Sequence, residues 1–180
     1  QGKPVVENPA LTNSENWSVQ PQNFVLYAVK YVNPWHGQYL RRGIDNATID
    51  GTSKVIVRHE QFVEKDEAVD ISTESMKDNL LTLKTKDAAG NDISYTIRMS
   101  FTEDGVCTLS SGSQNAVVSG NGKFVSKGEK NSLGGKDRNA IYLDYTVNLT
   151  ENNIQLATKD TLVLRTRNVQ GGKAFEVIRK

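Results

Sequence analysis

The sequence predicts an all-β protein, most simply a closed antiparallel up-and-down barrel of about eight strands. Apolar residues recur at every second position in run after run, which is typical of strands with one buried face. Asp-Gly and Asn-Gly dipeptides, which tolerate the positive φ of tight hairpin turns, stand between several of these runs. Helical periodicity never extends beyond a turn or two, and its best candidate is residues 73–79. A two-sheet sandwich is the alternative architecture.

The chain begins with a polar stretch that contains Pro4, Pro9 and Pro21. We expect residues 1–22 to be an extended lead-in or interdomain linker, because proline interrupts regular structure. Residues 23–180 are expected to form a single β-barrel domain, since all-β barrels of this length are commonly undivided.

The period-2 pattern assigns the strands in order. Residues 93–101 are the clearest strand, because five apolar side chains alternate there with Ser, Thr and Arg. The strong runs are residues 24–32, 55–63, 80–86, 93–101, 141–149, 161–166 and 174–178. The weaker runs are residues 69–71, 106–109, 116–118 and 124–126. Turns are expected at Asp50-Gly51, Asp104-Gly105 and Asn121-Gly122. Bulky residues in the inward rows indicate a barrel filled by side chains.

Composition excludes some classes of function. The 180 residues include 22 basic and 21 acidic side chains, so the basic excess of a nucleic-acid-binding protein is missing. No apolar stretch approaches the ~20 residues of a transmembrane helix. The single cysteine, Cys107, lies in a short apolar run and is expected to be a buried, unreactive thiol.

Catalytic and metal-binding motifs are not found. His36 and His59 are far apart and have no second ligand at helical or strand spacing, so no metal or other cofactor is expected. The sequence lacks the residues required for a phosphate-binding loop, a dinucleotide-binding fingerprint or a Gly-x-Ser-x-Gly nucleophile elbow. Acidic residues between 64 and 70 are most simply a solvated loop. The sequence therefore predicts that the protein is not an enzyme.

One segment, residues 32–43, concentrates aromatic and cationic side chains directly after an apolar run. Aromatic faces stack on sugars, and Arg side chains bind hydroxyls and anions through paired donors. A binding site here would use Trp35, Tyr39 and Tyr31 for stacking and His36, Arg41 and Arg42 for polar contacts. The structural alternative is a Trp35 that plugs a barrel end while an Arg stacks on it in a cation–π contact. A likeness to lipocalin-like barrels, in which a Trp near the first strand packs against an Arg of the last strand, would give this part to Arg165 or Arg167.

Two segments also resemble a known group of proteins. Residues 27–43, with the pattern His-Gly-x-Tyr-x-Arg-x-Gly, are similar to uncharacterised barrel domains in cell-surface lipoproteins of gut Bacteroidetes. Residues 160–169 and 175–178 resemble the last strands of the same domains. The resemblance implies a lipocalin-like (calycin-like) barrel, an outer-membrane lipoprotein at the cell surface or in the periplasm, and a role beside glycan-harvesting systems. Such proteins usually carry an immunoglobulin-like domain first.

Three functions follow from these observations. The first is a non-catalytic module that binds glycans, or supports their binding, through the segment at residues 32–43. The second is a structural or partner-docking barrel, with outer-membrane proteins as partners and the same aromatic residues buried. The third is a carrier of a small ligand inside a hollow barrel, which the bulky inward rows disfavour.

Overall fold

The computed structural model describes residues 2–21 and 31–167. The described residues belong to two compact units, residues 2–21 and residues 31–167. The expected strand at residues 174–178 lies outside the described residues, as do residues 24–30 of the strand expected at 24–32.

The described part of the first unit is a small hairpin-like element. β1 (Lys3–Pro4) pairs antiparallel with β2 (Trp17–Val19), and the 3-10 turn η1 (Ser14–Asn16) precedes β2. The Asn13 side chain caps this turn by accepting a hydrogen bond from the Glu15 amide at 3.1 Å. The indole Nε1 of Trp17 donates to the Ala10 carbonyl at 2.9 Å, so Trp17 fixes the loop that joins the two strands.

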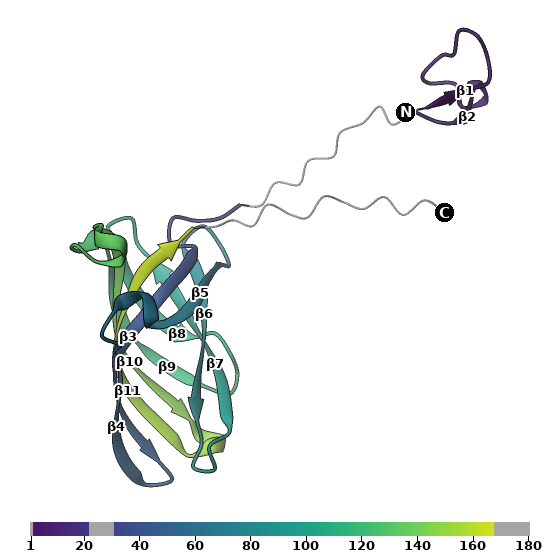
Figure 1. The fold of residues 1–180 in the computed structure, drawn as a ribbon. Coiled ribbons are helices and arrows are strands. Elements are labelled where there is room, and N and C mark those ends of the chain that lie inside the picture. Colours follow the sequence, from purple (N-terminus) through teal and green to yellow (C-terminus); the bar gives the residue numbers. More distant parts are fainter. Residues whose placement is uncertain (1, 22–30, 168–180) are drawn as a thin grey trace. The chain divides into compact units, whose positions relative to one another are not determined.

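The second unit is a closed antiparallel barrel of eight strands, as the sequence predicts (Figure 1). Neighbouring strands are β3, β5, β6, β7, β8, β9, β10 and β11, and β11 closes the barrel by pairing with β3. The bounds are β3 (Gly37–Ile49), β4 (Thr52–Arg58), β5 (Glu67–Thr73), β6 (Asp78–Lys86), β7 (Asp92–Phe101), β8 (Val106–Ser111), β9 (Val117–Glu129), β10 (Arg138–Leu149) and β11 (Ile154–Thr166). Short 3-10 turns stand at η2 (Val63–Lys65), η3 (Leu133–Gly135) and η4 (Thr150–Asn152).

The long strand β3 changes its neighbour halfway along. Its second half, from Gly43, forms a hairpin with β4, whereas its first half, up to Arg41, pairs with β5. The turn between β3 and β4 is the predicted Asp50-Gly51, and both residues have the positive φ of a two-residue hairpin turn. β4 is therefore a ninth strand that lies at the end of the sheet and outside the closed ring.

Alternating side chains fill the barrel. The inward rows predicted at residues 93–101 and 141–149 are confirmed, since Ile97, Met99, Ile141 and Leu149 are fully buried. The buried rows of β3, β5, β6, β8, β9 and β11 complete one continuous core cluster. The cluster occupies the space that a small-ligand carrier would need to leave open.

Some sequence predictions differ from the structure. Residues 73–79 comprise the last residue of β5, the turn that follows it and the start of β6, and do not form a helix. Asn121-Gly122 lies inside β9, so the two weak strands predicted on either side of it are one strand. The sequence pattern assigned no strand to residues 37–49, which form the long strand β3. A Cβ at Gly43 would collide with the Lys159 carbonyl and the Asp160 carboxylate, so the close approach of β11 explains this glycine.

Candidate functional site

The aromatic residues of the segment at residues 32–43 lie mostly in the core. Trp35 is 8% exposed and stacks on Phe101 of β7, with ring centroids 4.3 Å apart and planes within 7°. Tyr39 is fully buried, and its hydroxyl donates to the Trp35 carbonyl at 2.9 Å. The ring partner of Trp35 is thus Phe101, where the sequence suggested Arg165 or Arg167. In this conformation neither Trp35 nor Tyr39 presents a face to a ligand outside the barrel.

Arg41 points into the barrel and belongs to a buried ionic cluster. Its Nε donates to Asp160 at 2.8 Å, and Asp160 also accepts the Tyr145 hydroxyl at 2.8 Å. Arg58 bridges the same Asp160, at 2.6 Å, to Asp45. We call this group the interior ionic cluster; its members are Arg41, Asp45, Arg58, Tyr145, Thr158 and Asp160.

The interior ionic cluster lies where the pairing partner of β3 changes from β5 to β4. Arg41 also reaches Glu67 at the start of β5, at 3.1 Å. Burial works against the charged form of Arg41, but Tyr145 and Asp160 outweigh it and raise the pKa of this guanidinium. The Nε of Arg58 is buried without a hydrogen-bond partner among the described residues. These contacts hold strands β3, β4, β10 and β11 together, and we interpret the cluster as structural.

The remaining candidates of this segment lie at the surface and are not brought together. Arg42 points outward and its Nε pairs with the buried carboxylate of Asp66 at 2.6 Å. His36 is half-buried at the rim, where its Nδ1 accepts a hydrogen bond from the Thr73 amide at 3.3 Å. Tyr31 is 57% exposed. The six predicted site residues therefore divide between core, ionic cluster and rim.

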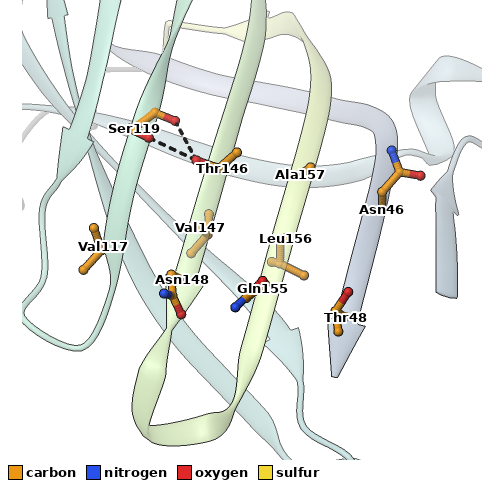
Figure 2. A pocket seen from close by; sticks show the side chains of 10 residues that line it. All are labelled: Asn46, Thr48, Val117, Ser119, Thr146, Val147, Asn148, Gln155, Leu156 and Ala157. Atoms are coloured by element: carbon orange, nitrogen blue, oxygen red, sulfur yellow. Dashed lines mark hydrogen bonds between the residues drawn. The ribbon is translucent and has the colours of Figure 1, made fainter. Parts of the chain in front are cut away.

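A different set of side chains gathers on the outer wall of the barrel. The strand register places Val117, Asn148, Gln155 and Thr48 in one row across β9, β10, β11 and β3. The next row, two residues along each strand, holds Ser119, Thr146, Ala157 and Asn46. Figure 2 shows both rows. We call these eight residues the uncharged platform. They line a shallow depression of about 390 Å³.

The platform offers free amide groups and no charge. Within the described part of the chain, the carboxamides of Asn46, Asn148 and Gln155 make no hydrogen bond. Ser119 and Thr146 pair their hydroxyls at 3.0 Å, and Val117 is 66% exposed. Charged residues make up 24% of the sequence, so eight neighbouring outward positions without one are a distinct surface. The nearest ion pair, Asp144 with Lys159 at 3.3 Å, lies in the next row.

Sequence reasoning missed the platform for a physical reason. Its residues are the polar half of ordinary alternating strands, and each strand alone shows only a Thr, Asn, Gln or Ser at outward positions. The signal appears only when register aligns Asn148 with Gln155 and Gln155 with Thr48. The sequence contains those residues but not their alignment.

Other kinds of site find little support in the described residues. No group of three or more His, Cys, Asp or Glu side chains there could hold a metal ion. Burial raises the pKa of the Cys107 thiol to about 12, which agrees with the buried, unreactive thiol that the sequence predicts. No helix in residues 2–21 and 31–167 is long and apolar enough to cross a membrane.

Fold and site define the class of protein: a closed eight-stranded antiparallel barrel with a filled interior and an uncharged outer platform. The chain belongs to the family described as Domain of unknown function (DUF5627), whose model matches residues 34–168. It is similar to a structural-genomics protein of unknown function from Bacteroides ovatus, seen in a crystal structure at 2.40 Å resolution. The identity is 82% over the whole of this chain and 57% of that one, with a TM-score of 0.88. A search of curated proteins found no match.

Proposed function

We propose that the protein is a non-catalytic module that binds neutral glycans through the uncharged platform. The observation that carries the proposal is the row of Asn148, Gln155 and Thr48 on adjacent strands, with Asn46 beside it (Figure 2). A carboxamide offers both donors and an acceptor, so neighbouring carboxamides match the paired hydroxyls of a sugar ring. Ala157 and Val117 add apolar surface for the C–H faces of the ring.

The chemistry of the platform favours a neutral ligand. An anionic polysaccharide or a nucleic acid needs cationic side chains, and none is present in the two rows. Adjacent strands are about 4.8 Å apart, so a row across four strands offers an extended surface to a polymer chain. The depression is open, which suits a chain that passes across it rather than a small molecule held inside.

The other elements of the proposal rest on the sequence resemblance alone. They are a location at the cell surface or in the periplasm, a lipoprotein context, and work beside outer-membrane protein partners in glycan harvesting. The chain spans 57% of the length of the Bacteroides ovatus protein that it matches.

A partner-docking barrel is the second candidate. The burial of Trp35 and Tyr39 favours it, because those aromatic residues serve the core instead of a ligand. The exposed Val117 would also suit a protein contact. This candidate predicts that purified protein binds no polysaccharide of any kind.

The test is affinity electrophoresis of the 180-residue chain in gels that contain neutral polysaccharides, namely β-glucan, xylan or galactomannan, beside anionic pectin and heparin. We expect retardation by at least one neutral polymer and none by the anionic ones. The double variant Asn148→Ala/Gln155→Ala should weaken binding at least about tenfold, which is 1.4 kcal/mol. Its melting temperature should be unchanged, because exposed substitutions usually alter stability by less than about 0.5 kcal/mol.

The matched control is Gln114→Ala, which removes an exposed carboxamide from the turn between β8 and β9, outside the eight residues of the platform. The control should bind like the wild type. Retardation by every polymer alike, or equal binding by the double variant and the control, would contradict the proposal. No retardation at all would favour the docking barrel.

A further inference from the structure

The strand β4 leaves one of its two edges unpaired. It pairs with β3 alone, and no strand of the described residues covers its other edge. The hairpin turn places Ile49 opposite Thr52, and these two residues form a hydrogen-bonded pair. Along an antiparallel ladder, every second residue pair exchanges backbone hydrogen bonds and the pairs between them exchange no hydrogen bonds. The amide and carbonyl groups of Ser53, Val55 and Val57 therefore point toward the free edge. Such an edge is a template for another strand.

The outer face beside this edge is apolar and exposed. Val55 and Val57 of β4 are 65% and 62% exposed, and Ile44 of β3 stands opposite Val57. A groove of about 330 Å³ runs along this face between Ile44, Val57 and His59. In Figure 1, β4 lies at the lower left beside β3 and apart from β6 and β7, so a partner strand would meet it from outside.

From these observations we infer that β4 is a dimer interface, at which the β4 strands of two copies pair antiparallel about a two-fold axis at Val55. This inference goes beyond the proposed glycan function and does not depend on it. In this register Val55 faces its own copy, and Ser53 faces Val57 of the second chain. Every edge amide and carbonyl of these three residues gains a partner, which is the arrangement of strand addition.

Within a pair of two β4 strands, charge favours this register over its neighbours. Lys54 falls opposite the neutral Ile56 of the other chain, and Arg58 falls opposite Thr52. A two-fold axis at Lys54 would place two Lys54 side chains opposite each other, and one at Ile56 would set Lys54 against Arg58. Like charges directly opposite each other destabilise a strand pair. The outward residues of the inferred pair are Val and Ser only, which places valine beside valine at the centre.

The dimer would place both uncharged platforms on one face of a continuous sheet. Asn46 of the platform is the direct neighbour of Val55 across the β3–β4 ladder. The path between the two β11 strands crosses β3 and β4 of each chain, which is five strand spacings or about 24 Å. A polymer that reaches across this span would contact both platforms and bind with avidity.

The test is sedimentation equilibrium of the 180-residue chain over a wide range of concentration, with Val55→Glu, Val55→Lys and an equimolar mixture of the two. The wild type should approach twice the mass of one chain as its concentration rises. Each single variant should dissociate at least about tenfold more readily, because it sets a charge against its own copy. The mixture should recover association, because the carboxylate introduced in one chain then faces the ammonium group introduced in the other. Unchanged melting temperatures would show that the variants fold.

The control is Val117→Glu, which places the same charge on an exposed valine of the same wall, away from the edge. It should associate like the wild type. A single-chain mass for the wild type at every concentration would overturn the inference. So would a dimer that is indifferent to Val55→Glu, or variants whose mixture stays dissociated. Glycan retardation of a single-chain wild type would leave the proposed function standing while the dimer fails.

Discussion

The interior ionic cluster and the uncharged platform lie on opposite faces of the same strands, and their chemistry is the reverse of the usual arrangement. Inside the barrel, Arg41, Asp45, Arg58 and Asp160 are charged and shielded from water. Outside, two rows across four strands carry amides, hydroxyls and small apolar groups with no charge. Lys159 and Asp160 show the alternation at neighbouring positions, since the first is exposed and the second is buried.

The difference separates a structural site from a recognition site. Every charged group inside has a partner of opposite sign within hydrogen-bond distance, so the charges are compensated within the cluster. The buried Nε of Arg58 is the donor left without a partner among the described residues. On the platform the three carboxamides lack partners among the described residues, so their hydrogen-bonding capacity is available. A buried polar group without a partner is costly, whereas an exposed one is hydrated and exchanges water for a ligand. Substitutions on the two faces should therefore affect different observables.

The largest effect is expected for Asp160→Ala. The Asp160 side chain is fully buried and accepts from both Arg41 and Arg58, so its removal leaves two largely buried cations undercompensated. Breaking a buried ion pair from one side costs about 3–5 kcal/mol. We expect the free energy of unfolding to fall by that amount in urea denaturation.

The matched control is Asp144→Ala, on the neighbouring strand and the opposite face. Its carboxylate pairs with Lys159, and both side chains are more than half exposed. Exposed pairs contribute about 0–1 kcal/mol. Equal losses in the two variants would mean that the interior cluster stabilises no more than a surface pair does.

The sequence predicts those features of the fold that depend on neighbouring residues better than those that depend on residues far apart in the chain. Within one strand, period-2 alternation identified the inward row that runs from Tyr95 to Phe101. The dipeptide Asp50-Gly51 identified the turn between β3 and β4. The strand β3 was missed because Arg41 and Gly43 occupy inward positions where apolar residues are expected. Arg41 is tolerated there only because Asp160, far along the chain, lies on the strand beside it.

The site was less predictable than the fold for a related reason. Trp35 and Tyr39 are residue types that are common in sugar-binding loops. Whether they bind a sugar or pack in the core depends on what covers them, and Phe101 covers Trp35. Conversely, Gln155 is unremarkable in its own strand and becomes part of a row only through its neighbours Asn148 and Thr48. Both outcomes depend on contacts between residues distant in sequence, which local patterns do not encode.

The substitution Trp35→Ala tests whether this aromatic residue belongs to the structural side of the comparison. Because Trp35 is stacked on Phe101 and nearly buried, its truncation should cost about 3 kcal/mol of unfolding free energy. Tyr31→Ala, at the exposed residue directly before this segment, should cost less than about 0.5 kcal/mol. Thermal and urea unfolding of the two variants measure this. A Trp35→Ala protein that melts normally and loses glycan binding would return the binding site to this segment.

The smallest effect concerns alkaline pH and the interior tyrosines. Burial raises the pKa of Tyr39, Tyr95 and Tyr145 above the value of about 10 that tyrosine has in an unfolded chain. Their contribution to stability is complete below about pH 10, and it is lost as the pH rises toward the folded-state pKa values, because the unfolded chain then releases protons that the folded chain retains.

Outside the barrel, burial and the neighbouring Glu129 raise the pKa of Tyr142 to about 12. A raised tyrosine pKa therefore occurs on both faces and does not by itself identify the interior tyrosines in a titration. The distinction lies in cooperativity. We expect tyrosinate absorbance from the three interior residues to appear together with unfolding, as followed by circular dichroism. In Tyr142→Phe, that cooperative step should keep its midpoint. Interior tyrosines that ionise gradually while the circular dichroism stays native would show that water reaches the barrel interior, and the sharp contrast between the two faces would fail.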